Sequence, residues 1–401
     1  MFRGFSANVT AIITRVVTMI NDKRQKLKIL VVYHYIAKYR GPIFDALAMH
    51  DENIEFQFSS DILANNDIEL ISNTFYENNN FHRLENKWVF KGLWQRGLMK
   101  LIAVEQYDVV IFLADPGFFT TWLASIYLKF KPAKVIFWTH GFIRGNSLKD
   151  KLKLFFYRLA DGIFLYGDRA KLKLSSAGVP FNKLYPIYNS LDYLEQSKIR
   201  DSITSSEIKL KKRDVFSEPD TFQIVFVGRL TPQKKLGKIL ELVHQLEKEG
   251  LLVNLLIIGD GIELPLLLDQ TSYLGISSQV VFYGKTYNEK ELAVLLMGSD
   301  LCVSPGEIGL TAMHVMAYGV PVITHSNEFT QMPEFEAVIN GITGALFMDG
   351  DYEEMYRLVK TMINEPIKNI SQNCIDVIEE KYNPVSQKKL IIEAIDALYN
   401  T

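Results

Sequence analysis

From residue 27 onwards, short runs of hydrophobic residues alternate with longer segments whose hydrophobic positions repeat at helical spacing. The run over residues 109–113, Val-Val-Ile-Phe-Leu, contains no polar position, which predicts a strand covered on both faces of a parallel sheet. Strands and helices that alternate in this way are typical of α/β folds. The strands predicted in the first half are Leu27–His34, Asn53–Ser59, Asp108–Ala114, Lys134–Thr139 and Gly162–Tyr166.

A polar and charged stretch over residues 193–220 interrupts this alternation, and we predict the domain junction there. The pattern then resumes, which predicts two doubly wound, Rossmann-like parallel-sheet domains that face each other across a cleft. Ligands of such sheets bind at the carboxyl ends of the strands. The elements predicted in the second half are strands Phe222–Val227, Val253–Ile258, Val280–Tyr283, Leu301–Ser304 and Pro321–Thr324, and helices over 236–249, 289–298 and 310–318.

The predicted organisation has four parts. Residues 1–26 form an amphipathic extension, because Val9, Ile12, Val16 and other apolar residues recur there at helical spacing. Three alternatives remain open for it: contact with a membrane surface, docking on the protein, or a disordered leader. The other parts are an N-terminal Rossmann-like domain over 27–200, a C-terminal Rossmann-like domain over 201–382, and a C-terminal helix over 383–401 that is a candidate to cross back to the first domain.

The composition fits two hydrophobic cores, since 48% of the 401 residues are hydrophobic. The charge is uneven: residues 1–200 hold 27 Lys and Arg against 18 Asp and Glu, and residues 201–401 hold 17 against 28. This asymmetry favours an anionic partner or membrane surface for the first half, and uneven solvation explains it equally well. Only two cysteines occur, at no metal-binding or redox spacing, which indicates a reducing, cytoplasmic location, with the inner face of the membrane as an alternative.

The first candidate binding motif follows the strand predicted to end at Val227. Gly228 lets a ligand approach the backbone, and Arg229 and Lys234 place two cations five positions apart. A guanidinium fork and a compact ammonium suit the oxygens of a diphosphate, and together they could neutralise it without a metal ion. The alternative is a solvated turn with ordinary surface cations.

A second motif runs from Ser304 to His314, between a predicted strand and a predicted helix. Gly306 and Gly309 free the loop to expose backbone amides, and the helix start at Leu310 and Thr311 offers unpaired N–H groups. These features predict an anion-binding loop. The alternative is a plain strand-to-helix turn punctuated by Pro and Gly.

Residues 225–347 resemble the donor-binding half of the retaining glycosyltransferases of family 4, also called glycosyl transferases group 1, which have the two-domain GT-B architecture. Matching pieces of the first half are looser: Tyr39-Arg40-Gly41-Pro42, Thr139-His140-Gly141 and Asn189-Ser190-Leu191-Asp192. The six matching pieces of the second half are Val227-Gly228-Arg229-Leu230-Thr231-Pro232-Gln233-Lys234, Ile257-Ile258-Gly259-Asp260-Gly261, Val281-Phe282-Tyr283-Gly284, the segment from Ser304, Ala317-Tyr318-Gly319-Val320-Pro321-Val322-Ile323 and Gly341-Ile342-Thr343-Gly344.

The resemblance implies roles for individual residues. The family has two glutamates eight positions apart, and Gly306 and His314 stand in their place here. Glu307 is displaced by one residue as a substitute for the first glutamate, and His314 can still hydrogen-bond a ribose hydroxyl. His140 and Glu307 are the catalytic candidates, and Arg40 and Gly41 match the acceptor side. The implied donor-binding set is Gly228, Arg229, Lys234, Gly261, Gly306, Glu307, Gly309, Leu310, Thr311 and His314.

The implied activity is transfer of a sugar from a UDP or GDP sugar to a hydroxyl group of a glycan or lipid-linked acceptor, with retention of configuration. We expect no metal and no other cofactor, because Asp349-Gly350-Asp351 fits a turn and a helix cap better than a metal site. Nucleic acid is not an expected partner, since the basic residues over 149–158 fit one face of a helix. The alternatives are a GT-B-type epimerase or phosphorylase and a non-catalytic nucleotide-sugar-binding scaffold, which the missing glutamates favour.

Overall fold

A computed structural model describes residues 26–64, 68–141 and 147–399 of the chain. Nearly all of the expected N-terminal amphipathic extension, residues 1–25, therefore lies outside the described residues. Within the described part, no helix combines the length and the apolar character that crossing a membrane requires.

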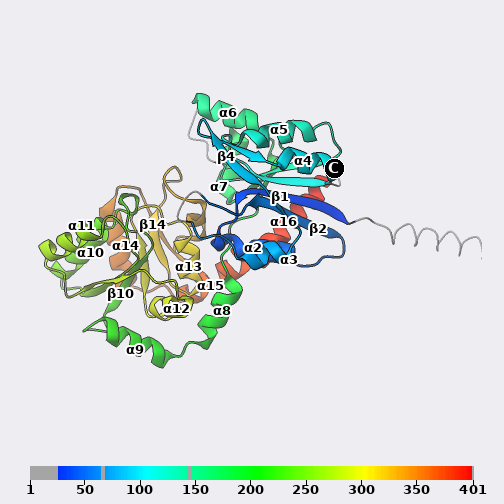
Figure 1. The fold of residues 1–401 in the computed structure, drawn as a ribbon. Helices are drawn as coiled ribbons and strands as arrows, with labels where there is room; N and C mark the ends of the chain where they lie inside the picture. Colours follow the sequence, from blue (N-terminus) through cyan, green and yellow to red (C-terminus); the bar gives the residue numbers. More distant parts are fainter. Residues whose placement is uncertain (1–25, 65–67, 142–146, 400–401) are drawn as a thin grey trace, which may run out of the picture. The chain divides into compact units, whose positions relative to one another are not determined.

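The chain separates into two compact units, and each is considered by itself (Figure 1). The division passes through the first sheet, after Trp138 in one strand and after Ile163 in the next. His140 therefore belongs to the second unit. The domain limits expected at residues 200 and 382 stay a prediction. The described residues of 1–138, 155–163 and 398–401 form unit 1, and those of 139–154 and 164–397 form unit 2.

The first sheet has seven strands in the order β3-β2-β1-β6-β7-β8-β9. Its centre is the fully buried run Ile29 to Val31, which pairs in parallel with β2 on one side and with β6 on the other. A strand buried on both faces explains why no polar position interrupts such runs. The strands are β1 (Leu27–Tyr35), β2 (Ile54–Asp61), β3 (Phe81–Arg83), β6 (Val109–Leu113), β7 (Lys134–Thr139), β8 (Gly162–Leu165) and β9 (Leu184–Pro186).

The second sheet has six parallel strands in the order β12-β11-β10-β13-β14-β15. The order reverses beside β10, where the chain moves from β12 at one edge to β13 on the other side of β10. In an open α/β sheet, the carboxyl ends at such a switch point are where ligands bind. The strands are β10 (Phe222–Val227), β11 (Val253–Ile258), β12 (Val280–Gly284), β13 (Leu301–Ser304), β14 (Val322–His325) and β15 (Gly344–Phe347).

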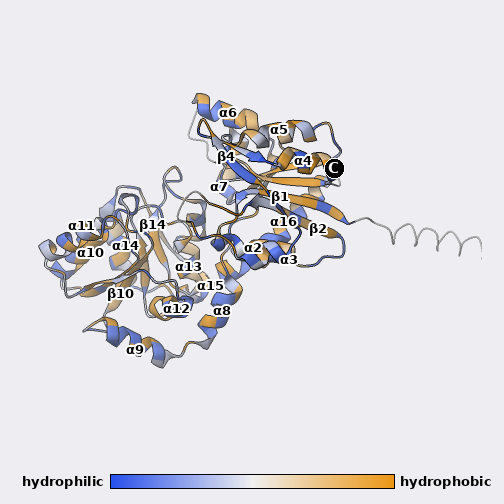
Figure 2. Ribbon diagram, viewed as in Figure 1, coloured by the Kyte–Doolittle hydropathy of each residue, from blue (hydrophilic) through white to orange (hydrophobic). Residues whose placement is uncertain are grey.

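Helices connect these strands, and hydrophobic residues concentrate in the strands while the helices carry both kinds of residue (Figure 2). The helices before the second sheet are η1 (Lys38–Arg40), α2 (Gly41–Ala48), α3 (Asn73–Asn78), α4 (Leu98–Val104), α5 (Phe119–Leu128), α6 (Leu148–Tyr157), α7 (Asp168–Ser176), η2 (Phe181–Lys183), α8 (Tyr193–Ser202) and α9 (Ser205–Val215). The later ones are η3 (Pro232–Lys234), α10 (Gly237–Lys248), α11 (Leu264–Leu274), α12 (Glu289–Met297), α13 (Thr311–Ala317), η4 (Pro333–Ala337), α14 (Tyr352–Asn364), α15 (Ile370–Lys381) and α16 (Pro384–Tyr399).

The predicted α/β architecture is confirmed: the chain holds two parallel, Rossmann-like sheets with helices between their strands. Four predicted strands, β7, β10, β11 and β13, have the predicted ends. The polar stretch over 193–220, where the domain junction was predicted, contains the helices α8 and α9, and Thr204 and Glu207 form a reciprocal capping box at the start of α9. An antiparallel hairpin of β4 (Glu85–Val89) and β5 (Gly92–Arg96) was not predicted.

Candidate functional site

Three strands of the second sheet, β10, β11 and β13, lead into glycines whose backbones touch neighbouring loops. Gly228 and Gly259 have φ angles of 148° and 150°, a region that residues with a side chain rarely adopt. A Cβ on Gly259 would lie 1.9 Å from the carbonyl oxygen of Gly228, and a Cβ on Gly306 would lie 1.9 Å from that of Gln233. We call Gly228, Gly259 and Gly306 the glycine shelf. It leaves the backbone of three strand ends in direct contact.

Lys234 ties the loop after β10 to the loop after β13. Its Nζ donates a hydrogen bond of 2.7 Å to the backbone oxygen of Glu307 and lies 3.6 Å from that residue's carboxylate Oε1. Burial lowers the pKa of Lys234, although the charge of Glu307 acts in the opposite direction. Glu307, the catalytic candidate, is thus held beside a lysine at the edge of the glycine shelf.

Arg229 differs from Lys234 because its side chain is exposed. Among the residues that the structure describes, none forms a hydrogen bond or ion pair with its guanidinium group. The charge of Arg229 contributes to the lowered pKa of Lys234, after burial, so the two cations lie close together. We call Arg229 and Lys234 the cation pair. The pair offers positive charge that the protein itself does not fully neutralise.

The loop after β13 reaches α13, which is only seven residues long. Thr311 at its start donates a hydrogen bond of 3.0 Å to the backbone oxygen of Val227, directly before Gly228. Gly309 has a φ of 58°, a backbone conformation that favours glycine. A Cβ on Gly261 would lie 2.3 Å from the backbone oxygen of Leu230, so this position has no room for a side chain. Because a helix of less than two turns has a small dipole, the anion site depends on the cation pair more than on the helix start expected at Leu310.

His314 lies on α13 and bonds to a residue that the sequence motifs did not indicate. Its Nε2 is 3.0 Å from Oε1 of Glu289, the first residue of α12. The two residues lie 25 positions apart, and the sequence around Glu289 indicated only the start of a helix. His314 is therefore near the loop after β13 but its ring is engaged by a carboxylate from another helix.

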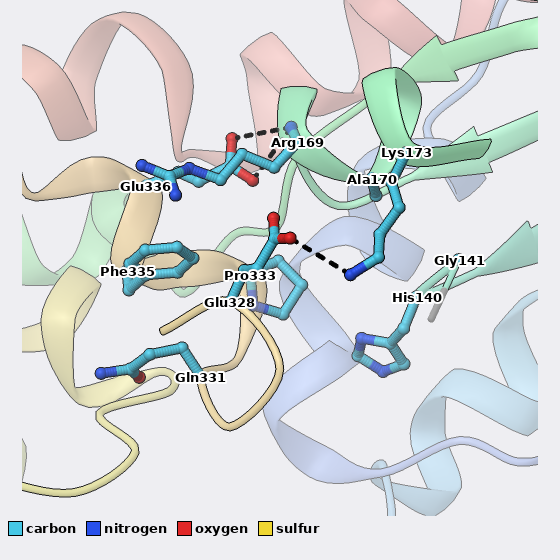
Figure 3. A pocket seen from close by; sticks show the side chains of 10 residues that line it. All are labelled: His140, Gly141, Arg169, Ala170, Lys173, Glu328, Gln331, Pro333, Phe335 and Glu336. Carbon is cyan, nitrogen blue, oxygen red and sulfur yellow. Dashed lines mark hydrogen bonds and ion pairs between the residues drawn. The ribbon is translucent and has the colours of Figure 1, made fainter. Parts of the chain in front are cut away.

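His140 lines a pocket within unit 2 (Figure 3). Lys173 points into this pocket from α7, and its Nζ lies 3.2 Å from Oε1 of Glu328. Arg169, one turn earlier on α7, lies over the ring of Phe335, with 4.7 Å between the guanidinium carbon and the ring centre. The residues of this His140 pocket are His140, Gly141, Arg169, Ala170, Lys173, Glu328, Gln331, Pro333, Phe335 and Glu336.

The Glu336 carboxylate occupies the start of α7. It accepts a hydrogen bond of 2.9 Å from the backbone N–H of Asp168. It accepts another, of 3.3 Å, from the backbone N–H of Arg169 (Figure 3). Gly167, before the helix, has no room for a side chain, because a Cβ there would lie 2.3 Å from Oε1 of Glu336. Burial raises the pKa of Glu336, and the bonds from the helix start only partly offset this effect.

Gln331 joins the His140 pocket to the glycine shelf. Its Oε1 accepts a hydrogen bond of 2.9 Å from the backbone N–H of Ile308, and its Nε2 donates one of 2.8 Å to the hydroxyl of Thr324. Its side chain is buried, although the residue lines the pocket. The loop that holds Glu307 and the pocket that contains His140 are therefore neighbours. The sequence offered no signal for Gln331, which lies in a segment without a recognisable motif.

The acceptor candidates Arg40 and Gly41 lie in unit 1, at the start of α2. Arg40 is buried, and its guanidinium carbon lies 5.8 Å from the ring centre of Trp138 and 5.6 Å from that of Tyr39. Cation–π contacts of this kind hold the guanidinium in place. The donor candidates all belong to unit 2.

The segment Asp349-Gly350-Asp351 has the structural roles expected of it. The Asp351 carboxylate caps α14 by accepting a hydrogen bond of 2.8 Å from the backbone N–H of Glu354. Burial raises the pKa of Asp349, but an ion pair of 2.8 Å with Lys235 and a hydrogen bond from Asn327 outweigh it and hold the pKa at about 2. The described residues contain no cluster of three or more His, Cys, Asp or Glu that could bind a metal ion. A metal-free reaction stays a prediction.

Comparisons with known proteins find glycosyltransferases that are similar to part of this chain. An uncharacterized glycosyltransferase of Methanocaldococcus jannaschii is 32% identical over 152 residues, which are 37% of each chain. The capsular polysaccharide biosynthesis glycosyltransferase CapM of Staphylococcus aureus is 24% identical over 192 residues, which are 45% of this chain and 47% of CapM. In these matches the chain spans less than half the length of its curated relatives.

The fold has a solved counterpart. The crystal structure of HepE from Anabaena, in complex with UDP, matches with a TM-score of 0.69 and 16% identity over 93% of this chain and 100% of HepE. At this identity the likeness shows the fold, which is GT-B, as predicted. Residues 207–380 match the model of the family Glycosyl transferases group 1.

Proposed function

We propose that the protein is a glycosyltransferase that takes a sugar from a nucleoside-diphosphate sugar, with UDP or GDP as the nucleotide, and transfers it to a hydroxyl group of a glycan or lipid-linked acceptor. The observation that carries this proposal is the exposed guanidinium of Arg229 beside Lys234, at the carboxyl end of β10. The match of residues 207–380 to a glycosyltransferase family supports it independently.

The diphosphate would lie against the cation pair on the glycine shelf. When the bond between the sugar and the diphosphate breaks, negative charge grows on the leaving phosphate oxygens. Arg229 and Lys234 are in place before the reaction and stabilise that charge without reorganising, which is the main source of catalysis at sites of this kind. Two fixed cations can do this without a metal ion.

The sugar would occupy the His140 pocket, which Gln331 joins to the loop of Glu307. The pocket has an aromatic residue, Phe335, and equal numbers of cationic and carboxylate side chains (Arg169, Lys173, Glu328 and Glu336). Such a charge-balanced surface suits a neutral group with many hydroxyls better than it suits a second anion. His140 and Glu307 are then the groups nearest to the reacting sugar, and the resemblance to family 4 implies retention of configuration.

The acceptor is proposed on two grounds. The relative CapM acts in capsular polysaccharide biosynthesis, which supports a glycan or lipid-linked glycan. The surplus of Lys and Arg in residues 1–200 supports contact with an anionic membrane from the cytoplasmic side. Arg40 and Gly41 stay the acceptor candidates.

Thermal unfolding in the presence of EDTA tests the donor site. A ligand at 100 times its Kd stabilises a protein by about 2.7 kcal/mol, which gives a clear shift in Tm. We expect UDP or GDP sugars to raise Tm in EDTA, Arg229→Ala to abolish the rise, and Lys238→Ala to keep it. Lys238 is a suitable control because it forms an exposed ion pair with Glu241 in the same unit. A full shift in Arg229→Ala would contradict the proposed site.

Product analysis then separates the proposal from its alternatives. Transfer to an acceptor with release of the nucleotide supports the glycosyltransferase. Inversion of a free nucleotide sugar without an acceptor would point to an epimerase of the same fold. Saturable binding without hydrolysis or transfer would point to a non-catalytic scaffold, for which the replacement of two family glutamates by Gly306 and His314 is the reason.

A further inference from the structure

Helix α5 in unit 1 carries its large hydrophobic residues on the face that solvent reaches. Phe119, Leu123 and Ile126 repeat at helical spacing on that face, and Phe130 continues the stripe just after the helix. Their exposed fractions run from 44% for Phe119 to 84% for Phe130. The buried positions are mostly small or polar, being Thr120, Thr121, Ala124, Ser125 and Leu128. A surface helix usually has the reverse arrangement, so this face is suited to an apolar partner.

The hairpin of β4 and β5 extends the stripe of α5 (Figure 1). The ring of Phe119 lies directly over Gly92 in β5, because a Cβ on Gly92 would lie 2.3 Å from it. Trp94 points to the same side of β5 as Gly92, since side chains alternate along a strand. In the turn before Gly92, Phe90 is 97% exposed. We call these exposed residues the apolar face: Phe90, Trp94, Phe119, Leu123, Ile126 and Phe130.

Positive charge borders the apolar face. Residues 85–96 and 115–131, which hold the hairpin and α5, contain five Lys and Arg against two Asp and Glu. One further carboxylate, Asp161, pairs with Lys129 at 2.7 Å. Lys91 follows Phe90 in the hairpin turn and Lys131 follows Phe130; both are exposed, and neither forms an ion pair with any residue that the structure describes. The face is thus apolar at its centre and cationic at two of its edges.

We propose that the apolar face is a docking surface for a lipid bilayer with anionic headgroups. Aromatic and aliphatic side chains flanked by lysines suit the boundary between headgroups and acyl chains, where the apolar groups are buried and the ammonium groups stay among the phosphates. A two-fold contact between copies of this chain is disfavoured, because it would bring the same lysines of both copies together. The inference rests on the proposed function only for the membrane contact, which it assigns to particular residues.

Co-sedimentation of the full chain with vesicles tests the apolar part of this surface. The vesicles hold equal amounts of phosphatidylglycerol and phosphatidylcholine. We expect Phe90→Ser to lower the partition coefficient about tenfold, because an aromatic side chain no longer leaves water on binding. Tyr273→Ser is the matched control, since Tyr273 on α11 in unit 2 is 90% exposed, and it should bind like the wild type. Equal binding of Phe90→Ser and the wild type would assign the contact to another segment, such as residues 1–26, and overturn the inference.

A double variant tests the charged part. Lys91→Gln combined with Lys131→Gln should lower binding to the same vesicles about thirtyfold at low ionic strength, because it removes two charges that an anionic surface attracts. Lys248→Gln combined with Lys368→Gln removes two exposed lysines of unit 2 and should leave binding unchanged. If the wild type bound vesicles of phosphatidylcholine alone as tightly as the anionic ones, the proposed partner would be wrong.

Two further measurements do not depend on a loss of vesicle binding. Bromine-labelled lipids should quench the added indole of Phe90→Trp and leave that of Tyr273→Trp unquenched; equal quenching in the two variants would contradict the docking surface. Sedimentation without lipid should give the same mass for the wild type and Phe90→Ser. A dimer that Phe90→Ser dissociates would assign the apolar face to a second copy of the chain and overturn the inference.

These outcomes are separate from those of the donor site. If UDP binding depends on Arg229 while Phe90→Ser and the wild type bind vesicles equally, the inference is wrong and the proposed function stands. If vesicle binding depends on Phe90 while no nucleotide sugar binds, the docking surface stands and the proposed function fails.

Discussion

The glycine shelf, with its cation pair, differs in charge balance from the His140 pocket. At the shelf, Lys234 lies 3.6 Å from the Glu307 carboxylate, whereas the exposed Arg229 has no carboxylate partner among the described residues, so one positive charge is in excess. In the pocket, Lys173 faces Glu328, and Glu336 lies at the start of the helix that carries Arg169. An excess of positive charge favours an anion, whereas a balanced surface favours a neutral ligand. Two neighbouring regions can thus divide one nucleotide sugar between them.

The largest effect is expected from Gly306→Ala, which tests whether the shelf is what holds the diphosphate. The new methyl group would lie 1.9 Å from the backbone oxygen of Gln233, so the loop of Lys234 must move. We expect a destabilisation of a few kcal/mol by urea unfolding and at least a hundredfold loss of UDP affinity. Gly298→Ala is the control, because a Cβ there meets its nearest atom at 3.3 Å. Equal UDP affinity in both variants would contradict the role of the shelf.

The next effect concerns the cation pair. Lys234→Met keeps a side chain of similar length without its charge, and charge-assisted hydrogen bonds contribute about 1.5–3 kcal/mol. We expect UDP affinity to fall by about thirtyfold in calorimetry. Lys235→Met, which removes the neighbouring charge that pairs with Asp349, should leave UDP affinity within about twofold. A loss of similar size in both variants would mean that general electrostatics, and not the cation pair, attracts the nucleotide.

A substitution in the His140 pocket should reduce sugar transfer and leave UDP affinity unchanged. Lys173→Met removes a cation of the His140 pocket, which is proposed to bind the sugar and not the diphosphate. UDP affinity should therefore stay within about twofold. Sugar transfer should fall by about tenfold in kcat/KM, since the charge balance beside His140 is lost and the sugar is displaced. Lys171→Met on the same helix, where the lysine lies over Phe181, should change neither. If Lys173→Met weakened UDP as strongly as Lys234→Met does, the division between shelf and pocket would be wrong.

A pH titration sharpens the same contrast. Burial holds the pKa of Lys234 below the ordinary 10.5, so the lysine loses its charge earlier than a solvated lysine as pH rises. UDP affinity should therefore decrease in alkaline solution at pH values below 10.5. Lys234→Arg keeps its charge throughout this range, and its UDP affinity should be flat. A decrease of the same size in Lys234→Arg would assign the titration to another group.

The smallest effect is a change in how stability depends on pH. The folded-state pKa of Glu336 is raised above its ordinary value of 4.5, so its contribution to stability is complete below pH 4.5 and is lost as pH rises through the folded pKa. Glu336→Gln does not titrate. We expect urea unfolding to show a wild type that loses stability relative to this variant as pH rises above 4.5. A constant difference between the two proteins would contradict the raised pKa.

The sequence predicted the second sheet well because its strands are buried on both faces. The runs that became β10 and β11 have no polar interruption long enough to suggest another structure, and their ends coincide with the glycines that the shelf requires. The hairpin of β4 and β5 was missed for the opposite reason. None of the residues of β4 is buried, and the turn places Phe90 and Lys91 at φ angles of 48° and 64°, where Asn or Gly is the usual signal.

The candidate site was predictable only where its residues are close in sequence. Gly228, Arg229 and Lys234 lie within seven positions, and their residue types alone predict an anion-binding turn. Glu289 and Gln331 act through contacts 25 and 23 positions away, and Glu336 meets α7 across 168 positions. No pattern along the chain encodes such pairings, because they depend on how helices pack around the sheet.

The glycines at three adjacent strand ends also limit which positions of the site can be substituted. Positions 259 and 306 cannot gain even a methyl group without moving a neighbouring loop, and the φ of 148° at Gly228 strains any residue with a side chain, so all three are poor places for new specificity to arise. Variation is left to the side chains that border the contact, such as Glu307 and His314. A change in nucleotide or sugar specificity, during evolution or in the laboratory, would then come from substitutions of these bordering residues, while the three glycines stay the same.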